Sequence, residues 1–104
     1  MVQEPILETV SIDRLLAILG SEPRRELIRC LQGERGMMLE STLADAFSST
    51  MDLDDLDIAL RHIHLPKLVE AGCIAWDRHT GTIGPGKTYD IFDRALQSIE
   101  QSMR

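Results

Sequence analysis

The segment from His64 to Ile83 restricts the possible folds of this chain more than any other part of it. It reads HLPKLVEAGCIAWDRHTGTI. This order has the features of a helix end, a glycine stop, a short apolar strand, a polar turn and a second strand. Gly72 suits the position just after a helix, where the backbone often adopts a positive φ. The runs Cys73–Trp76 and Thr82–Ile83 are spaced as two antiparallel strands joined by a loop. The segment therefore predicts a helix that leads directly into a β-hairpin.

Four helices are expected before the hairpin, from apolar residues spaced three and four apart. Ser11 and Ser21 are suited to cap the first two, and Gly20 separates them. A third helix is expected from Ser41, and the polar run Ser48–Thr50 is the expected turn before the fourth. The inward residues expected for the first two helices are Ile12, Leu15, Leu16, Leu19, Leu27, Ile28 and Leu31.

The fourth helix is expected to be long, from about Leu53 to Ala71. On a helical wheel, the residues of its inward face are Leu53, Leu56, Leu60 and Ile63. The residues of its outward face are Asp54, Ile58, Arg61, His62 and Leu65. Pro66 has no N–H to donate to the carbonyl of residue 62, so a kink is expected there.

Together these elements predict a mainly α fold with a small antiparallel sheet, to which Met37–Leu39 contributes a very short strand. Gly81 is expected to take a positive φ in the hairpin loop, and Gly84–Gly86 is expected to break the sheet. We expect a flexible arm at residues 1–10, a core domain at 11–86 and a C-terminal helix within 87–104.

The C-terminal helix, Tyr89 to Met103, has apolar residues at a spacing of four, three and four. This is the spacing of a heptad seam, although it covers less than two repeats. Such a seam packs on the rest of the domain or on a second copy of the chain, and we expect a homodimer. The residues predicted for the dimer interface are Phe92, Leu96, Ile99 and Met103.

The composition, 43% hydrophobic and 27% charged over 104 residues, is that of one globular domain. No apolar run is long enough to span a bilayer and the N-terminus is unlike a signal peptide, so a cytoplasmic protein without membrane contact is expected. The net charge is −6, and the basic residues are nine arginines and only two lysines, Lys67 and Lys87. Cys30 and Cys73 are not part of a CxxC pair, so two reduced, buried thiols are expected.

Two segments of the chain resemble a known family. They are LGSEPRRELIRCLQ at residues 19–32 and HIHLPKLVEAGCIAWDRHTGTI at residues 62–83. Both are similar to segments of the small winged helix-turn-helix domains of halophilic archaea, and the chain is more remotely similar to repressors of the ArsR and MarR type. The resemblance implies a winged helix-turn-helix fold and a role in transcription. An excess of acid with little lysine is also the composition expected of proteins from cells that hold high internal salt.

The leading functional hypothesis is a DNA-binding transcriptional regulator. The fourth helix would enter the major groove, and the hairpin tip, or wing, would contact the DNA backbone or minor groove. Arg24, Arg25 and Arg29 would flank this surface. The residues predicted to contact DNA are Ser48, Ser49, Thr50, Ile58, Arg61, His62, Arg78, His79 and Thr80.

Acidic residues at the start of the fourth helix are the main argument against this hypothesis. Asp52, Asp54, Asp55 and Asp57 lie where a DNA-reading helix usually contacts bases, and they would repel phosphates. They have a structural explanation as well, because carboxylates at a helix start cap its N–H groups and interact favourably with its dipole.

The alternative hypothesis is a protein-interaction module that has the same fold and does not bind DNA. Ile58 and Leu65 on the outward face, together with the C-terminal seam, would then pack against a partner. A metal sensor is disfavoured, because His62 and His64 are two residues apart and do not share a helix face. No pairing of nucleophile and base and no glycine-rich phosphate loop is present, so neither enzymatic activity nor a cofactor or metal is expected.

Overall fold

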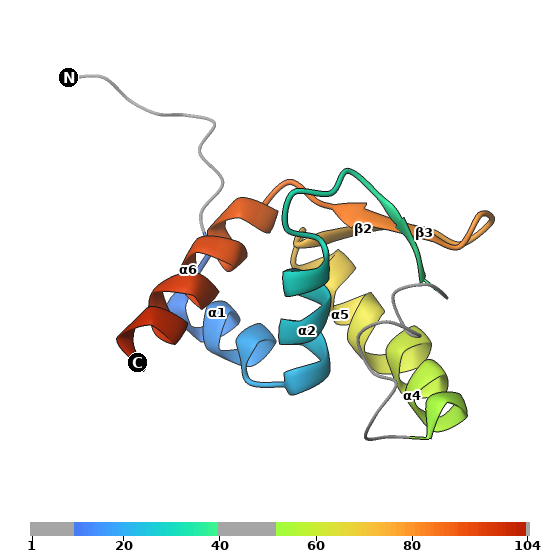
Figure 1. Cartoon of the computed structure of the whole chain (residues 1–104), viewed down its shortest axis with the longest axis horizontal. Coiled ribbons are helices and arrows are strands. Elements are labelled where there is room, and N and C mark those ends of the chain that lie inside the picture. Colours follow the sequence, from blue (N-terminus) through green and yellow to red (C-terminus); the bar gives the residue numbers. More distant parts are fainter. Residues whose placement is uncertain (1–9, 40–51, 104) are drawn as a thin grey trace.

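The structure, a computed structural model, describes residues 10–39 and 52–103. The third helix expected from Ser41 lies outside this range, as does the turn at Ser48–Thr50. The elements in chain order are α1 (Ile12–Leu19), α2 (Glu22–Cys30), β1 (Met37–Met38), α4 (Leu53–Ala59), η1 (Leu60–His64), α5 (Leu65–Glu70), β2 (Ile74–Asp77), β3 (Thr82–Pro85) and α6 (Tyr89–Ser102) (Figure 1). The fold is mainly α with a small antiparallel sheet whose β2–β3 hairpin forms a wing, as the sequence predicts.

The three strands are ordered β1-β3-β2, and both pairings are antiparallel. Gly72 and Gly81 have φ of 77° and 75°, which confirms the helix stop and the loop conformation predicted for them. The expected break at Gly84–Gly86 is wrong, because β3 continues to Pro85, which pairs with Ile74 of β2. These glycines allow close approach instead: a Cβ at Gly84 would lie 2.6 Å from the carbonyl oxygen of Arg35.

The helix expected from Leu53 to Ala71 is interrupted by a π-helical turn, η1, just before Pro66. The N–H of Leu65 donates to the carbonyl of Leu60, five residues earlier, whereas in a regular α-helix it would donate to the carbonyl four residues earlier. A regular helix would press the proline ring against the carbonyl of residue 62, and a wider turn relieves that clash. The predicted disturbance at Pro66 therefore takes the form of one extra residue in a helical turn.

The extra residue rotates everything that follows it around the helix axis. Leu56 and Leu60, before the rotation, are buried as predicted. After it, Ile63 is 50% exposed although it was expected inside, and Leu65 is fully buried although it was expected outside. Both predictions are wrong for the same reason, since a constant 100° per residue does not hold through a π turn.

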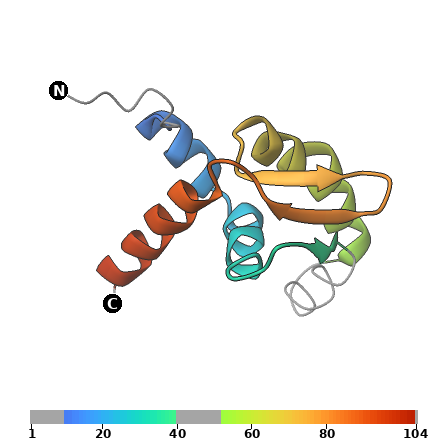
Figure 2. The ribbon, with the colours of Figure 1, turned by 90° about the horizontal axis from the view of Figure 1, so that it is seen from above.

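The core lies between the helices and the inner face of the sheet. In α2, Leu27, Ile28 and Leu31 are fully buried, as predicted. In α1 the prediction holds for Leu19 and fails for two residues: Ile12 and Leu16 are 73% and 61% exposed. Figure 2 shows α1 and α6 on one side of α2, with the hairpin and α4–α5 on the other side. The outer flank of α1 is therefore left uncovered by the described part of the chain.

Helix α6 completes the core through contacts with α1 and α2. Phe92 and Leu96 are 0% and 1% exposed, and the Tyr89 hydroxyl donates to the carbonyl of Ile28 at 2.5 Å. Phe92 and Leu96 are thus core residues of a single chain and cannot also form the dimer interface that was predicted for them. Ile99 and Met103, at 44% and 80% exposed, are the two residues of that seam that stay accessible.

Candidate nucleic-acid interface

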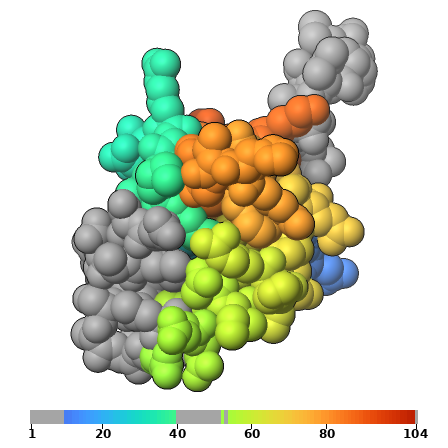
Figure 3. All heavy atoms as spheres, turned by 90° about the vertical axis from the view of Figure 1, so that its right-hand side faces the viewer, coloured from blue at the N-terminus to red at the C-terminus, as the bar shows by residue number. Residues whose placement is uncertain are grey.

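The outward side of α4–η1 and the β2–β3 wing lie next to each other on one face of the molecule (Figure 3). We call this surface the helix–wing face; its described residues are Asp52, Asp54, Asp55, Asp57, Ile58, Arg61, His62, Ile63 and Asp77 to Thr80. It holds six of the nine residues predicted to contact DNA. Ser48, Ser49 and Thr50 lie outside the described residues.

The acidic start of α4 serves as its cap. The Asp52 carboxylate accepts a hydrogen bond from the N–H of Asp54 at 2.9 Å and a longer one from that of Asp55 at 3.5 Å. Asp54 and Asp55 lie in the first turn and are exposed. All three carboxylates thus sit where they favour the helix dipole, which confirms their structural explanation. They also leave an acidic edge on the helix–wing face.

Arg61 is paired within its own helix. Its Nε donates to Oδ1 of Asp57 at 2.8 Å, and both side chains are about one-third exposed. This i, i+4 pair neutralises part of the arginine charge, but it leaves both terminal NH2 groups of the guanidinium without a partner in the described chain. Those are the donors that arginine uses toward guanine in the major groove. The contribution of Asp57 was missed, although its spacing from Arg61 could have indicated it.

Ile58, about one turn before Arg61, and His62, the residue after it, extend the outward surface of the helix. Ile58 is 58% exposed, and His62 is exposed four residues later on the same side. An apolar side chain here suits a thymine methyl group, and the imidazole suits a base edge or a phosphate. Ile63, rotated outward by the π turn, adds apolar surface that the sequence analysis did not assign to this face.

The tip of the wing is organised by its own contacts. Arg78 lies over the Trp76 ring, 4.4 Å from its centroid, and Arg78, His79 and Thr80 are all exposed. The Asp77 carboxylate accepts from the N–H of His79 at 2.9 Å. Stacking holds the Arg78 guanidinium in place without neutralising it. The wing therefore presents a positioned cation, which suits a phosphate or a minor groove.

The arginines expected to flank this surface have structural roles. Arg24 donates to the carbonyls of Ala17 and Ile18, and Arg25 donates to that of Leu19, so both cap the last turn of α1. Arg29 pairs with Glu26 and Glu100. These three cations were predicted on an outward helix face, but helix ends and acidic side chains nearby already bind them.

His64 lies behind the helix–wing face, against α2. Its Nδ1 is 3.0 Å from NH1 of Arg24, so the imidazole accepts this hydrogen bond in its neutral form. Burial lowers the pKa of His64 below its ordinary value of 6.5, and the charges of Arg24 and Lys67 lower it further. Among residues 10–39 and 52–103, no cluster of three histidine, cysteine or acidic side chains could hold a metal ion.

Comparison with known proteins identifies a family for most of the chain. A family model described as a domain of unknown function, DUF7344, matches residues 16–84, from within α1 to within β3. The match covers well over half of the chain, so the chain belongs to this family. No curated protein and no solved structure matches it. Within the described ranges, no helix is both long and apolar enough to cross a membrane.

Proposed function

We propose that this chain, a member of the DUF7344 family, is a cytoplasmic DNA-binding transcriptional regulator of the winged helix-turn-helix type. Helix α4–η1 lies in the major groove, where Arg61 and His62 contact base edges. The tip of the β2–β3 wing contacts the backbone or the minor groove through Arg78, His79 and Thr80.

One observation carries this proposal. Arg61 on the helix and Arg78 on the wing are far apart in sequence, yet they occupy two adjacent elements of one exposed face (Figure 3). Each is oriented by a neighbour, Asp57 in one case and Trp76 in the other, and each keeps donors that no residue of the described ranges occupies. A helix and a hairpin with positioned arginines fit a groove and the phosphates beside it.

The acidic cap of α4 determines how such a complex responds to salt. The described part of the helix–wing face has few cations for phosphates, so few counterions are released on binding, and its aspartates repel the DNA. With one or two phosphate contacts, log K falls with log salt at a slope of only about −1 to −2. Repulsion is screened as the Debye length shrinks to about 3 Å at 1 M salt. Binding should therefore survive salt concentrations that dissociate most DNA-binding proteins.

A titration of genomic DNA fragments in low and in multi-molar potassium chloride tests the proposal. Arg61→Ala is expected to weaken binding and relax its sequence preference, and Arg78→Ala is expected to weaken it evenly across sequences. Arg94→Ala is the matched control, because Arg94 is an exposed arginine of α6, outside the helix–wing face. If no fragment is retained at any salt, or if both test variants bind like the control, the DNA-binding proposal is wrong.

We further propose that the regulator is a homodimer formed through α1 and α6. These helices contact each other and carry four exposed apolar side chains: Ile12, Leu16, Ile99 and Met103. A second copy would cover them, and two-fold symmetry would present two helix–wing faces to a palindromic site. Light scattering on Ile99→Glu and Leu16→Glu tests this, with Ile58→Glu as the control on the other face. A wild-type chain of monomer mass would refute the dimer.

A second candidate function is a protein-interaction module without DNA binding. Ile58 and Ile63 are both at least half exposed on the outward side of α4–η1, next to the acidic cap. A partner with an apolar groove and a basic rim would suit this surface. The two functions differ in the substitutions that matter: here Ile58→Glu would abolish partner binding, and Arg61→Ala and Arg78→Ala would leave it unchanged.

A further inference from the structure

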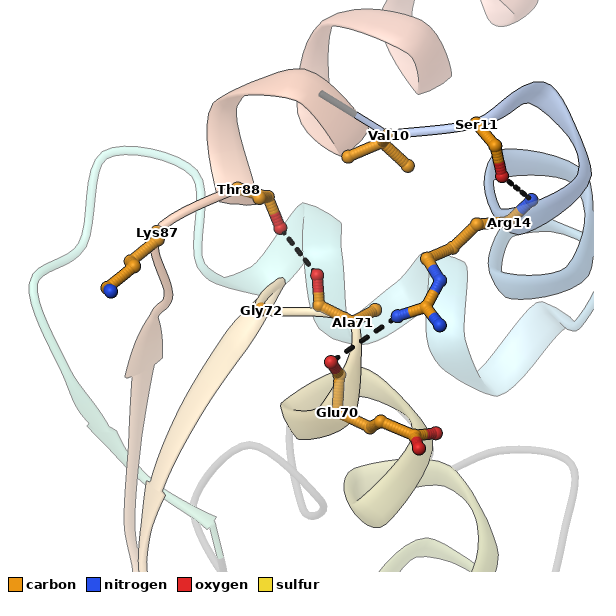
Figure 4. Close-up of a pocket in the computed structure, with 8 residues that line it drawn as sticks. All are labelled: Val10, Ser11, Arg14, Glu70, Ala71, Gly72, Lys87 and Thr88. Atoms are coloured by element: carbon orange, nitrogen blue, oxygen red, sulfur yellow. Dashed lines mark hydrogen bonds between the residues drawn. The ribbon is translucent and has the colours of Figure 1, made fainter. Parts of the chain in front are cut away.

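A cavity of about 470 Å³ lies where α1, the end of α5 and the start of α6 meet, at the base of the β2–β3 hairpin and not at its tip (Figure 4). Its volume is within the range of about 300–1,000 Å³ that small-molecule sites occupy. Arg14 of α1 and Lys87, just before α6, line it on opposite sides of Gly72, and the Lys87 side chain extends away from Arg14. This cavity is not part of the proposed DNA-binding surface.

Both cations of the cavity have donors to spare. The Arg14 side chain makes one hydrogen bond, from NH1 to the carbonyl of Glu70 at 3.3 Å, which leaves the rest of its guanidinium uncommitted within the described chain. Lys87 is exposed and forms no hydrogen bond or ion pair with any described residue. In a chain with 17 acidic and 11 basic residues, two cations that line one cavity without an ion pair to any described residue are a distinctive feature.

The backbone around the cavity also favours a negative ligand. The carbonyls at the end of α5, which would repel an anion, already accept hydrogen bonds: Glu70 from Arg14, Ala71 from the Thr88 hydroxyl at 2.8 Å, and Gly72 from the Thr88 N–H at 2.9 Å. In contrast, α1 and α6 both begin at lining residues, Ser11 and Thr88. Two helix starts add partial positive charge to that of the side chains.

A smaller pocket of about 130 Å³ continues the cavity on the other side of Arg14 and is lined by Lys67. The only two lysines of the chain therefore flank the same arginine. The acidic residue shared by the two pockets is Glu70, and its carboxylate forms no ion pair with Arg14 or with either lysine. Three cations and one carboxylate give this site a local positive charge on an acidic protein.

We propose that this cavity binds a small anion with two negative groups, one on Arg14 and the other on Lys87, whose exposed side chain turns toward the ligand. Carboxylate and phosphate groups share the required chemistry, because both accept hydrogen bonds from guanidinium and ammonium donors. Glu70 opposes the ligand charge and limits the affinity. The site stands independently of DNA binding, since none of its lining residues belongs to the helix–wing face.

The test is a titration of the full-length chain with succinate and, separately, with inorganic pyrophosphate, followed by backbone amide NMR in about 0.15 M salt, where the Debye length is about 8 Å. Saturable shifts are expected at Gly72, Thr88 and Arg14, and the probe that binds more tightly identifies the anionic group. Lys87→Gln should weaken binding by about tenfold, the effect of one lost charge-assisted hydrogen bond. Glu70→Gln should tighten it.

Arg94→Gln is the matched control, because it removes the same charge from an exposed site that lines neither pocket. It should leave the affinity within about twofold, since exposed charges at a distance are screened. Lys87 forms no hydrogen bond or ion pair with residues 10–39 or 52–103, so its variant separates a binding defect from a folding defect. Shifts that do not saturate, an equal effect of Arg94→Gln and Lys87→Gln, or weaker binding by Glu70→Gln would each refute the site.

Discussion

Deletion of Ile63 should convert the π turn into regular α-helix, and its effect on stability should depend on Pro66. The buried leucines of this helix are Leu56, Leu60, Leu65 and Leu68, at a spacing of four, five and three. Removing one residue from η1 changes the step of five to four, which keeps all of them on one face of a regular helix. The cost then comes from the proline, which would lie in a regular helix interior at about 3 kcal/mol.

A comparison of four chains measures this dependence: wild type, Pro66→Ala, the Ile63 deletion, and both changes together. Pro66→Ala should stabilise the deletion chain by about 3 kcal/mol, because only there does the ring meet a regular helix. In the wild-type background it should change the free energy of unfolding by less than about 1 kcal/mol. The deletion also shifts the contact between His64 and Arg24, but this changes the free energy of unfolding equally in both deletion chains and so does not affect their difference. Urea denaturation followed by circular dichroism gives the four values. Equal effects of Pro66→Ala in both backgrounds would show that the π turn does not accommodate the proline.

Three further predictions concern the core and the buried titratable groups. Phe92→Ala should destabilise the chain by about 3–5 kcal/mol in the same assay, and Ile99→Ala, at a half-exposed site of the same helix, by well under half of that. The pKa of His64 is lowered by burial and by Arg24, so the unfolded chain binds its proton more readily. The contribution of His64 to the free energy of unfolding is therefore fully present above pH 6.5 and declines as the pH falls below that value. This decline should be smaller in His64→Gln. Burial raises the pKa of Cys73 to about 12, so a thiol reagent at pH 8 should modify it only on unfolding, and rapid labelling of the native chain at Cys73 would contradict this.

The hairpin and the helix before it could be predicted because local chemistry determines them. Gly72 and Gly81 each mark a position where the backbone needs a positive φ, and the apolar run between them can only be a short strand. The N-cap roles of Ser11 and Asp52 follow in the same way from a side-chain oxygen placed before an amphipathic run. These local features were predicted correctly, whereas Ser21 makes no side-chain cap hydrogen bond and the expected break at Gly84–Gly86 is wrong.

The errors arise where distant neighbours decide. The spacing of apolar residues in α1 predicts an inward face that includes Ile12 and Leu16, but it does not show where α2 and α6 pack. These two helices cover Ile18 and Leu19 instead. The π turn was detectable in principle, because a step of five between Leu60 and Leu65 just before a proline does not fit a regular helix. The helical wheel assumed a regular helix through this step and therefore placed Leu65 on the outward face.

The roles of individual charged residues explain why the net charge of −6 is a poor guide to DNA binding. Of the nine arginines, Arg24 and Arg25 cap α1 and Arg29 joins α2 to α6, so these charges stabilise the fold and do not contribute to a binding surface. The aspartates of α4 likewise act first as a helix cap. Net charge therefore says little about the helix–wing face, where single, oriented arginines matter more than the sum. A surface of this kind would recognise DNA through base contacts more than through phosphate attraction, and its discrimination between sequences would then exceed what its modest affinity suggests.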